Sequence, residues 1–124
     1  MNIPGLTTAK RATGAVAARR IVVHGASDGL AVQAAASTAL LIGISTDIPA
    51  ADGQAFDVYR GGLAPVEYGG NVTRGAPLTA DAQGRAIAAT IPPVANTYII
   101  GFAEVSGVAG DIGSAFIAPA LLLA

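Results

Sequence analysis

The residues whose types could perform chemistry gather in one short stretch, IVVHGASDGLAVQAA, at residues 21–35. It holds His24, the single histidine of the chain, together with Ser27 and Asp28. A hydrolytic triad needs the histidine between the nucleophile and the orienting acid, with an oxyanion hole beside the nucleophile. Three neighbours on one tight turn do not meet that geometry, and the sequence has no G-x-S-x-G motif. We therefore predict a bend between two strands here, and a protein that is not an enzyme.

Other chemical patterns are equally incomplete. One histidine with scattered acids and no cysteine does not make a zinc site. The segment GVAGDIG at 107–113 lacks the Lys-Ser/Thr ending of a phosphate-binding loop. Asp57 and Glu67 could meet as a carboxylate pair across a hairpin, as in glycosidases, but solvated charges are far commoner in such places. The sequence predicts no catalytic residue, no cofactor and no metal.

The elements that would position these residues are short strands. From residue 21 onward, apolar runs of four to ten residues alternate with segments rich in Gly, Pro and Asp, and no window keeps a helical stripe. The segments ASDG at 26–29 and DAQG at 81–84 place glycine where a hairpin turn needs a positive φ. This texture predicts an all-β fold, a small barrel or sandwich.

The strands also follow one another in a repeated order. Each half contains a hairpin, a central apolar strand with an internal glycine, a Gly/Asp turn, and a strand that carries Phe. We predict two pseudo-repeated β units at about 21–60 and 76–118. The matching pieces are Ile21–Val32 with Ala76–Ile87, Leu41–Ile44 with Ile99–Phe102, and Ala55-Phe56 with Ala115-Phe116. The internal glycines, Gly43 and Gly101, mark either a bulge or a close approach of another backbone.

Charge divides the chain unevenly. Residues 1–20 carry Lys10, Arg11, Arg19 and Arg20 and no acid, whereas the remainder carries three arginines against eight acids, a balance of −5. We predict an extended basic N-terminal arm at 1–20, mobile in the free protein, before a single β domain at 21–124. Four charges without interleaved aromatics do not indicate nucleic-acid binding. The four basic residues are instead predicted to bind an acidic protein surface.

The composition favours association. Charged residues make up 12% of the 124 residues and much of the apolar share is alanine and glycine, so the core is thin. The last five residues, Ala120 to Ala124, include three consecutive leucines. A homo-oligomer, dimer or trimer, would bury apolar strand faces and this tail. The N-terminus lacks the unbroken apolar segment of a signal peptide, and the longest apolar run, residues 117–124, is far short of the roughly 20 residues of a membrane span, so we expect a soluble protein with no membrane partner.

Several stretches in succession resemble the small capsid cement, or head decoration, proteins of tailed bacteriophages. They are DGLAVQAA (28–35), LLIGIS (40–45), FDVYRGGLAPVEYGGNV (56–72), GAPLTADAQGRAIAA (75–89) and IIGFAEVSGVAGDIGSAFIAP (99–119). The resemblance implies a structural protein that sits as an oligomer on the outer surface of the virion head, after assembly in the host cytoplasm. There it would brace the joints between major capsid proteins without any small-molecule substrate. A small-ligand or carbohydrate-binding β-barrel remains the alternative.

Overall fold

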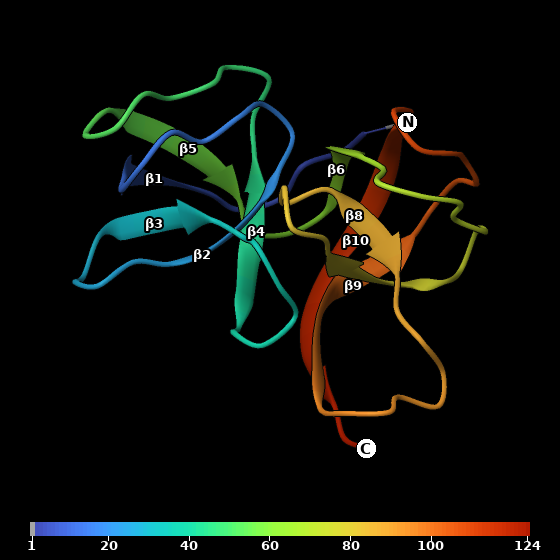
Figure 1. Ribbon diagram of the computed structural model, residues 1–124. Helices are drawn as coiled ribbons and strands as arrows, with labels where there is room; N and C mark the ends of the chain where they lie inside the picture. Colours follow the sequence, from blue (N-terminus) through green and yellow to red (C-terminus); the bar gives the residue numbers. More distant parts are fainter. Residues whose placement is uncertain (1) are drawn as a thin grey trace.

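The computed structural model describes residues 2–124, and over this range it contains ten β-strands and no helix. The first five strands form a closed barrel in the order β1-β3-β2-β4-β5 (Figure 1, left). Their bounds are β1 Thr7–Ala12, β2 Ile21–His24, β3 Leu30–Gln33, β4 Leu41–Ser45 and β5 Ala55–Tyr59. The all-β prediction is confirmed.

The other five strands form a second sheet beside the barrel (Figure 1, right), in the order β6-β10-β9-β7-β8. Their bounds are β6 Leu63–Glu67, β7 Pro77–Ala80, β8 Ala86–Ala88, β9 Thr97–Ala103 and β10 Ile112–Leu122. A single parallel bridge between Tyr68 and Ala86 links the two edges of this sheet. The second sheet therefore curls toward a barrel, but its two edge strands are not paired along their length.

Both units share one arrangement of strands. The order β3-β2-β4-β5 in the barrel has the same pairings as β8-β7-β9-β10 in the second sheet, and β1 lies beside β5 as β6 lies beside β10. An isolated bridge follows the first strand of each unit, Val16–Ala50 in one and Val72–Gly107 in the other. The repeated unit therefore begins one strand before the predicted bounds of 21–60 and 76–118.

The N-terminal segment is part of the barrel. We predicted residues 1–20 as a separate mobile arm; residue 1 lies outside the described residues, and Thr7–Ala12 forms β1. This strand pairs antiparallel with β5 over five residue pairs and parallel with β3. Ala12 and Val16 are buried in the barrel core. The predicted boundary at residue 20 is therefore wrong. The strand was missed because its sequence, TTAKRA, consists of small and polar residues that do not indicate a strand by composition.

The larger of two hydrophobic clusters joins the units. The barrel encloses its own small core, to which Val22, Ile42 and Val58 contribute. Because side chains alternate along a strand, Ile21 on β2 faces outward and packs in the second cluster instead. That cluster combines the outer barrel residues Ile21, Leu41 and Ile44 with the inner side of the second sheet, including Val66, Tyr68, Leu78, Ile100 and Ile117. The barrel thus covers the open side of the second sheet.

At the two internal glycines, Gly43 and Gly101, the backbone of a neighbouring strand approaches closely. A Cβ on Gly43 would overlap the carbonyl oxygen of Tyr59, and one on Gly101 would overlap that of Phe116. A register shift also lies beside each glycine, between Val22 and Val23 and on the neighbouring strand of Gly101. Each glycine therefore lies both beside a bulge and at a close approach of another backbone, the two explanations that the sequence suggested for it.

Candidate interaction surfaces

The stretch around His24 is a hairpin. β2 and β3 pair antiparallel, and the turn is closed by hydrogen bonds from Gly25 N to Leu30 O at 2.8 Å and from Leu30 N to Ser27 O at 3.2 Å. Gly29 has φ +80°, the conformation that the turn requires. His24, Ser27 and Asp28 are exposed and line an open hollow with Lys10. This geometry explains the stretch as a turn.

The hairpin geometry predicts how substitutions at His24 and Gly29 change the stability of the protein. His24→Ala should leave stability within about 0.5 kcal/mol of the wild type, because an exposed side chain is removed. Gly29→Val should cost at least about 1–2 kcal/mol, since a β-branched residue is strained at positive φ even where the space is open. Urea unfolding of both variants measures the difference. An equal loss at the two positions would contradict the assigned turn.

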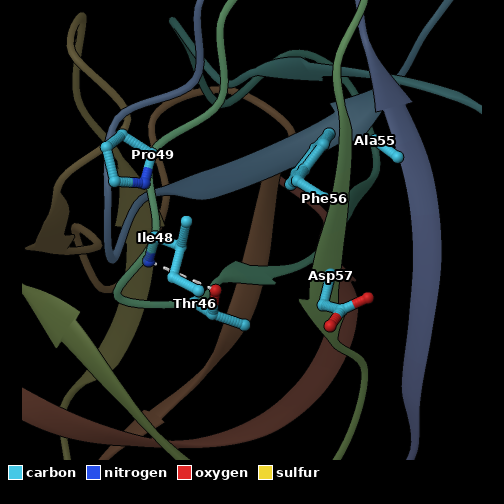
Figure 2. Close-up of a pocket in the computed structure, with 6 residues that line it drawn as sticks. All are labelled: Thr46, Ile48, Pro49, Ala55, Phe56 and Asp57. Atoms are coloured by element: carbon cyan, nitrogen blue, oxygen red, sulfur yellow. Dashed lines mark hydrogen bonds between the residues drawn. The ribbon is translucent and has the colours of Figure 1, made fainter.

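A second hollow lies on the barrel beside β5. Figure 2 shows the residues that line it, and the backbone N–H of Ile48 donates to Thr46 Oγ1 at 3.4 Å. Its volume is about 190 Å³, below the roughly 300–1,000 Å³ of ligand pockets. Its single aromatic residue, Phe56, is 7% exposed and packs into the barrel core. The lining thus lacks the open aromatic face that a carbohydrate site would present. It comprises Thr46, Ile48, Pro49, Ala55, Phe56 and Asp57.

The four basic residues predicted to bind a partner do not form one patch. Lys10 and Arg11 are adjacent on β1, so they point to opposite faces of the strand. Arg11 Nη1 donates to the carbonyl oxygen of Gly53 at 2.6 Å. Arg19 has a left-handed backbone, φ +57°, in the connection that leads to β2. Arg20 turns away from solvent, with 18% of its side chain exposed.

Arg20 instead joins the two units. Its Nη2 lies 3.3 Å from Glu67 Oε1 and its Nη1 donates to the carbonyl oxygen of Gln83 at 2.9 Å. Arg85 extends the network, with Nη1 3.9 Å from Glu67 Oε2 and Nε 3.0 Å from Asp81 Oδ2. Backbone bonds from Ile21 N to Gly84 O and from Glu67 N to Arg19 O run alongside. The guanidinium of Arg20 is therefore already engaged within the chain.

Sequence reasoning missed an exposed apolar row on the second sheet. Cross-strand pairing places Phe116 between Leu63 and Phe102, and Phe102 beside Pro77. Phe102 is 42% exposed and Phe116 is 50% exposed, although both lie in regular strands. Residues 115–117 are all apolar, so the sequence carried no alternation that could have separated the exposed Phe116 from its buried neighbours. We call Leu63, Pro77, Phe102 and Phe116 the apolar row.

The described residues hold no group of three or more His, Cys, Asp or Glu side chains placed to bind a metal. Over the same range, no helix long and apolar enough to cross a membrane is found. Burial raises the pKa of the Tyr68 phenol, whose hydroxyl donates to Val105 O at 2.7 Å. Tyr68 fills the core of the second sheet and is fully buried, so this perturbation belongs to packing.

Comparison with known proteins gives the fold a context. No curated protein matches the chain. Among solved structures, the N base of the head fiber protein gp8.5 of bacteriophage phi29 aligns with a TM-score of 0.70 and 21% identity, over 91% of this chain and 93% of that one. At this identity the likeness shows a shared fold. The sequence model of a family described as phage cement protein matches residues 2–114, nearly the whole chain, which therefore belongs to the phage cement protein family.

Proposed function

We propose that this protein is a structural component of the virion that binds the outer surface of an assembled phage head and stabilises the contacts between major capsid proteins. The observation that carries the proposal is the family match over residues 2–114. The fold shared with a head fiber base supports it. Such a protein acts by binding, without catalysis, cofactor or metal. It would reach its site on the virion after synthesis in the host cytoplasm.

The physical effect of such binding follows from mass action. A protein that binds only the expanded lattice stabilises that lattice by RT ln(1 + [L]/Kd) at each site. A body of two packed units, joined by a shared core and the Arg20–Glu67 link, can transmit load between two points of attachment. This arrangement suits a brace across a joint between capsid subunits.

Co-sedimentation with expanded heads that lack decoration tests the proposal. The purified full chain should pellet with these heads in a saturable manner and raise the temperature at which they rupture. Unexpanded heads serve as the matched control, because a lattice-specific brace should bind them less. A chain that stays in the supernatant with both kinds of head would contradict the proposed function.

We further propose that Lys10, Arg11 and Arg19 contribute to the capsid contact through acidic groups on the shell. Exposed ion pairs contribute only about 0.2–1 kcal/mol each, so Lys10→Ala/Arg11→Ala should weaken head binding by up to about thirty-fold. The loss should shrink as salt rises, because exposed charges are screened within about 10 Å at 0.1 M. Arg74→Ala, an exposed arginine of the second unit, is the control. Equal salt slopes for both variants and the wild type would show that these charges face away from the shell.

A further inference from the structure

One end of the molecule is formed by segments without a charged residue. They are the connection between β3 and β4, the connection between β8 and β9, and the end of β10, which lie together at the bottom of Figure 1. Every Lys, Arg, Asp and Glu of the chain lies outside residues 29–46, 86–103 and 112–124, which contain these segments. We call residues 34–40, 89–97 and 120–124 the uncharged end.

Hydrogen bonds hold the three segments together. Tyr98 N donates to Ser37 O at 2.9 Å, which joins the start of β9 to the connection between β3 and β4. Ala124 N donates to Asn96 Oδ1 at 3.0 Å, which joins the tail to the loop before β9. β10 reaches this end because it extends beyond β6 and pairs with β9 as far as Leu122. The uncharged end is therefore one surface, to which both units contribute.

Large aliphatic side chains project from this surface. Val94 is 91% exposed and Leu123 is 70% exposed. Leu40, Ile91 and Leu121 are exposed as well. The loop before β9 also contains two consecutive prolines, which restrict its backbone and lower the entropic cost of ordering it in a contact. A cluster of exposed aliphatic side chains on a restricted loop is typical of an interaction surface.

A hollow of about 270 Å³ opens between the β3–β4 connection and the loop before β9. Its volume lies just below the roughly 300–1,000 Å³ of small-molecule pockets, so it suits a protruding side chain better than a ligand. Two hydroxyl groups on its wall are engaged within the chain. Thr79 Oγ1 donates to Tyr98 O at 2.8 Å, and Thr97 Oγ1 donates to Ala95 O at 2.9 Å. The hollow therefore offers mainly apolar surface to a partner.

We propose that the uncharged end is a second attachment point to the phage head, where it binds an uncharged, apolar surface of a major capsid protein, one side chain of which enters the hollow. This proposal rests on the proposed function, from which it takes the binding of the head. A charged partner surface would lose its water here without gaining an opposite charge, which is unfavourable. Arg60 does reach into residues 29–46, but its Nε donates to Ile42 O at 2.8 Å.

The two proposed attachment points differ in place and in chemistry. Lys10 lies beside the hairpin at residues 24–29, which is at the opposite end of β3 from the uncharged end (Figure 1). Two contacts separated by the body of the protein suit a brace across a joint. Salt screens the ion pairs of the basic residues, whereas burial of aliphatic side chains does not depend on charge. The salt dependence of head binding therefore separates the two contacts.

Co-sedimentation with expanded heads at about 0.1 M and about 1 M salt tests the uncharged end, because the screening length falls from about 10 Å to about 3 Å between them. Val94→Gln/Leu123→Gln should lower head affinity at least about tenfold at both salt concentrations, since burial of one such side chain corresponds to roughly this factor. Val108→Gln/Ile112→Gln, an exposed aliphatic pair at the opposite end of β9 and β10, is the matched control and should bind like the wild type. Thermal unfolding verifies that each variant is folded. If the double variant does not fold, Val94→Gln alone takes its place.

Filling the hollow tests how the partner is held. Ala88 is exposed and lines the hollow, so Ala88→Phe should occupy it and lower head affinity by a similar factor. Ala82→Phe adds the same ring to an exposed alanine in the turn between β7 and β8 and should have no such effect. Equal head affinities of the two variants would show that no capsid side chain enters the hollow.

The outcomes separate this inference from the proposed function. A wild type that does not pellet with heads at either salt concentration would contradict the proposed function, and the uncharged end as an attachment point with it. If the wild type pelleted but Val94→Gln/Leu123→Gln bound equally well, only the uncharged end would be overturned. Loss of all wild-type binding at the higher salt concentration would overturn it too. If the variant kept its head affinity but lost self-association in sedimentation velocity, a second copy would cover this surface in place of the shell.

Discussion

Deletion of residues 1–20 should abolish the folding of the chain. The deletion removes β1, which pairs with both β3 and β5, and takes Ala12 and Val16 out of the barrel core. Two strand edges are left open, which invites aggregation. Because the barrel covers the core of the second sheet, the damage extends to both units. The expected loss is the whole stability of a small protein, about 5–15 kcal/mol.

Circular dichroism and thermal unfolding of the truncated chain measure this loss, which should appear as the absence of a cooperative transition. The matched control is Lys10→Ala/Arg11→Ala, which removes charge from β1 but keeps the strand. That variant should unfold cooperatively at nearly the wild-type temperature. A truncated chain with a native-like transition would instead show that β1 is dispensable and that residues 1–20 act as a separate arm.

The contrast between β1 and the later strands shows what sequence patterns can reveal. Strands such as Leu41–Ser45 are dense in Ile and Leu, so they are visible by composition. β1 takes its stability from neighbours on the barrel, and its small and basic side chains carry no such signal. Its place in the repeat is visible only in the structure. At an offset of 56 residues, Ala12 is equivalent to Tyr68, Val16 to Val72, and Arg19 with φ +57° to Gly75 with φ +89°.

The other wrong predictions concern contacts between residues that are far apart in the sequence. The match of Ala55-Phe56 with Ala115-Phe116 is wrong, because Phe116 pairs with Phe102 as Tyr59 pairs with Ile44. Phe56 points into the barrel, whereas Phe116 points out of the second sheet. Arg20 likewise has the composition of a free surface charge, but its partner, Glu67, lies 47 residues away. Register and partner choice depend on the tertiary fold, which local composition does not encode.

The glycines at turns and close approaches could be predicted from the sequence, because the backbone conformation there requires glycine. The turn glycines Gly29 and Gly84 both have positive φ, as hairpin chemistry required. Gly43 and Gly101 stand where another backbone comes within contact. Only glycine fits such positions, because it tolerates a positive φ or leaves room for a neighbouring backbone, so their identity is visible in the sequence. The predicted hairpins and central strands were therefore found at nearly their true places.

Gly101→Ala should be the most damaging single methyl addition in the second sheet. Gly101 is buried with φ +153°, and an added Cβ would overlap Phe116 O and lie 2.8 Å from Ala118 N. Backbone strain costs about 1–3 kcal/mol and overpacking a similar amount, so we expect a loss of about 2–6 kcal/mol. β10 would have to move away from β9, which also displaces Phe102 and Phe116 from their pairing.

Gly110→Ala is the matched control for that change. Gly110 also has a positive φ, +90°, but an added Cβ would meet no atom within 4 Å. Its cost is therefore backbone strain alone, about 1–2 kcal/mol. Urea unfolding of the two variants isolates the steric part as their difference. If Gly101→Ala lost no more stability than Gly110→Ala, the close approach of β10 would not constrain this position, and only the conformation of the glycine would explain its presence.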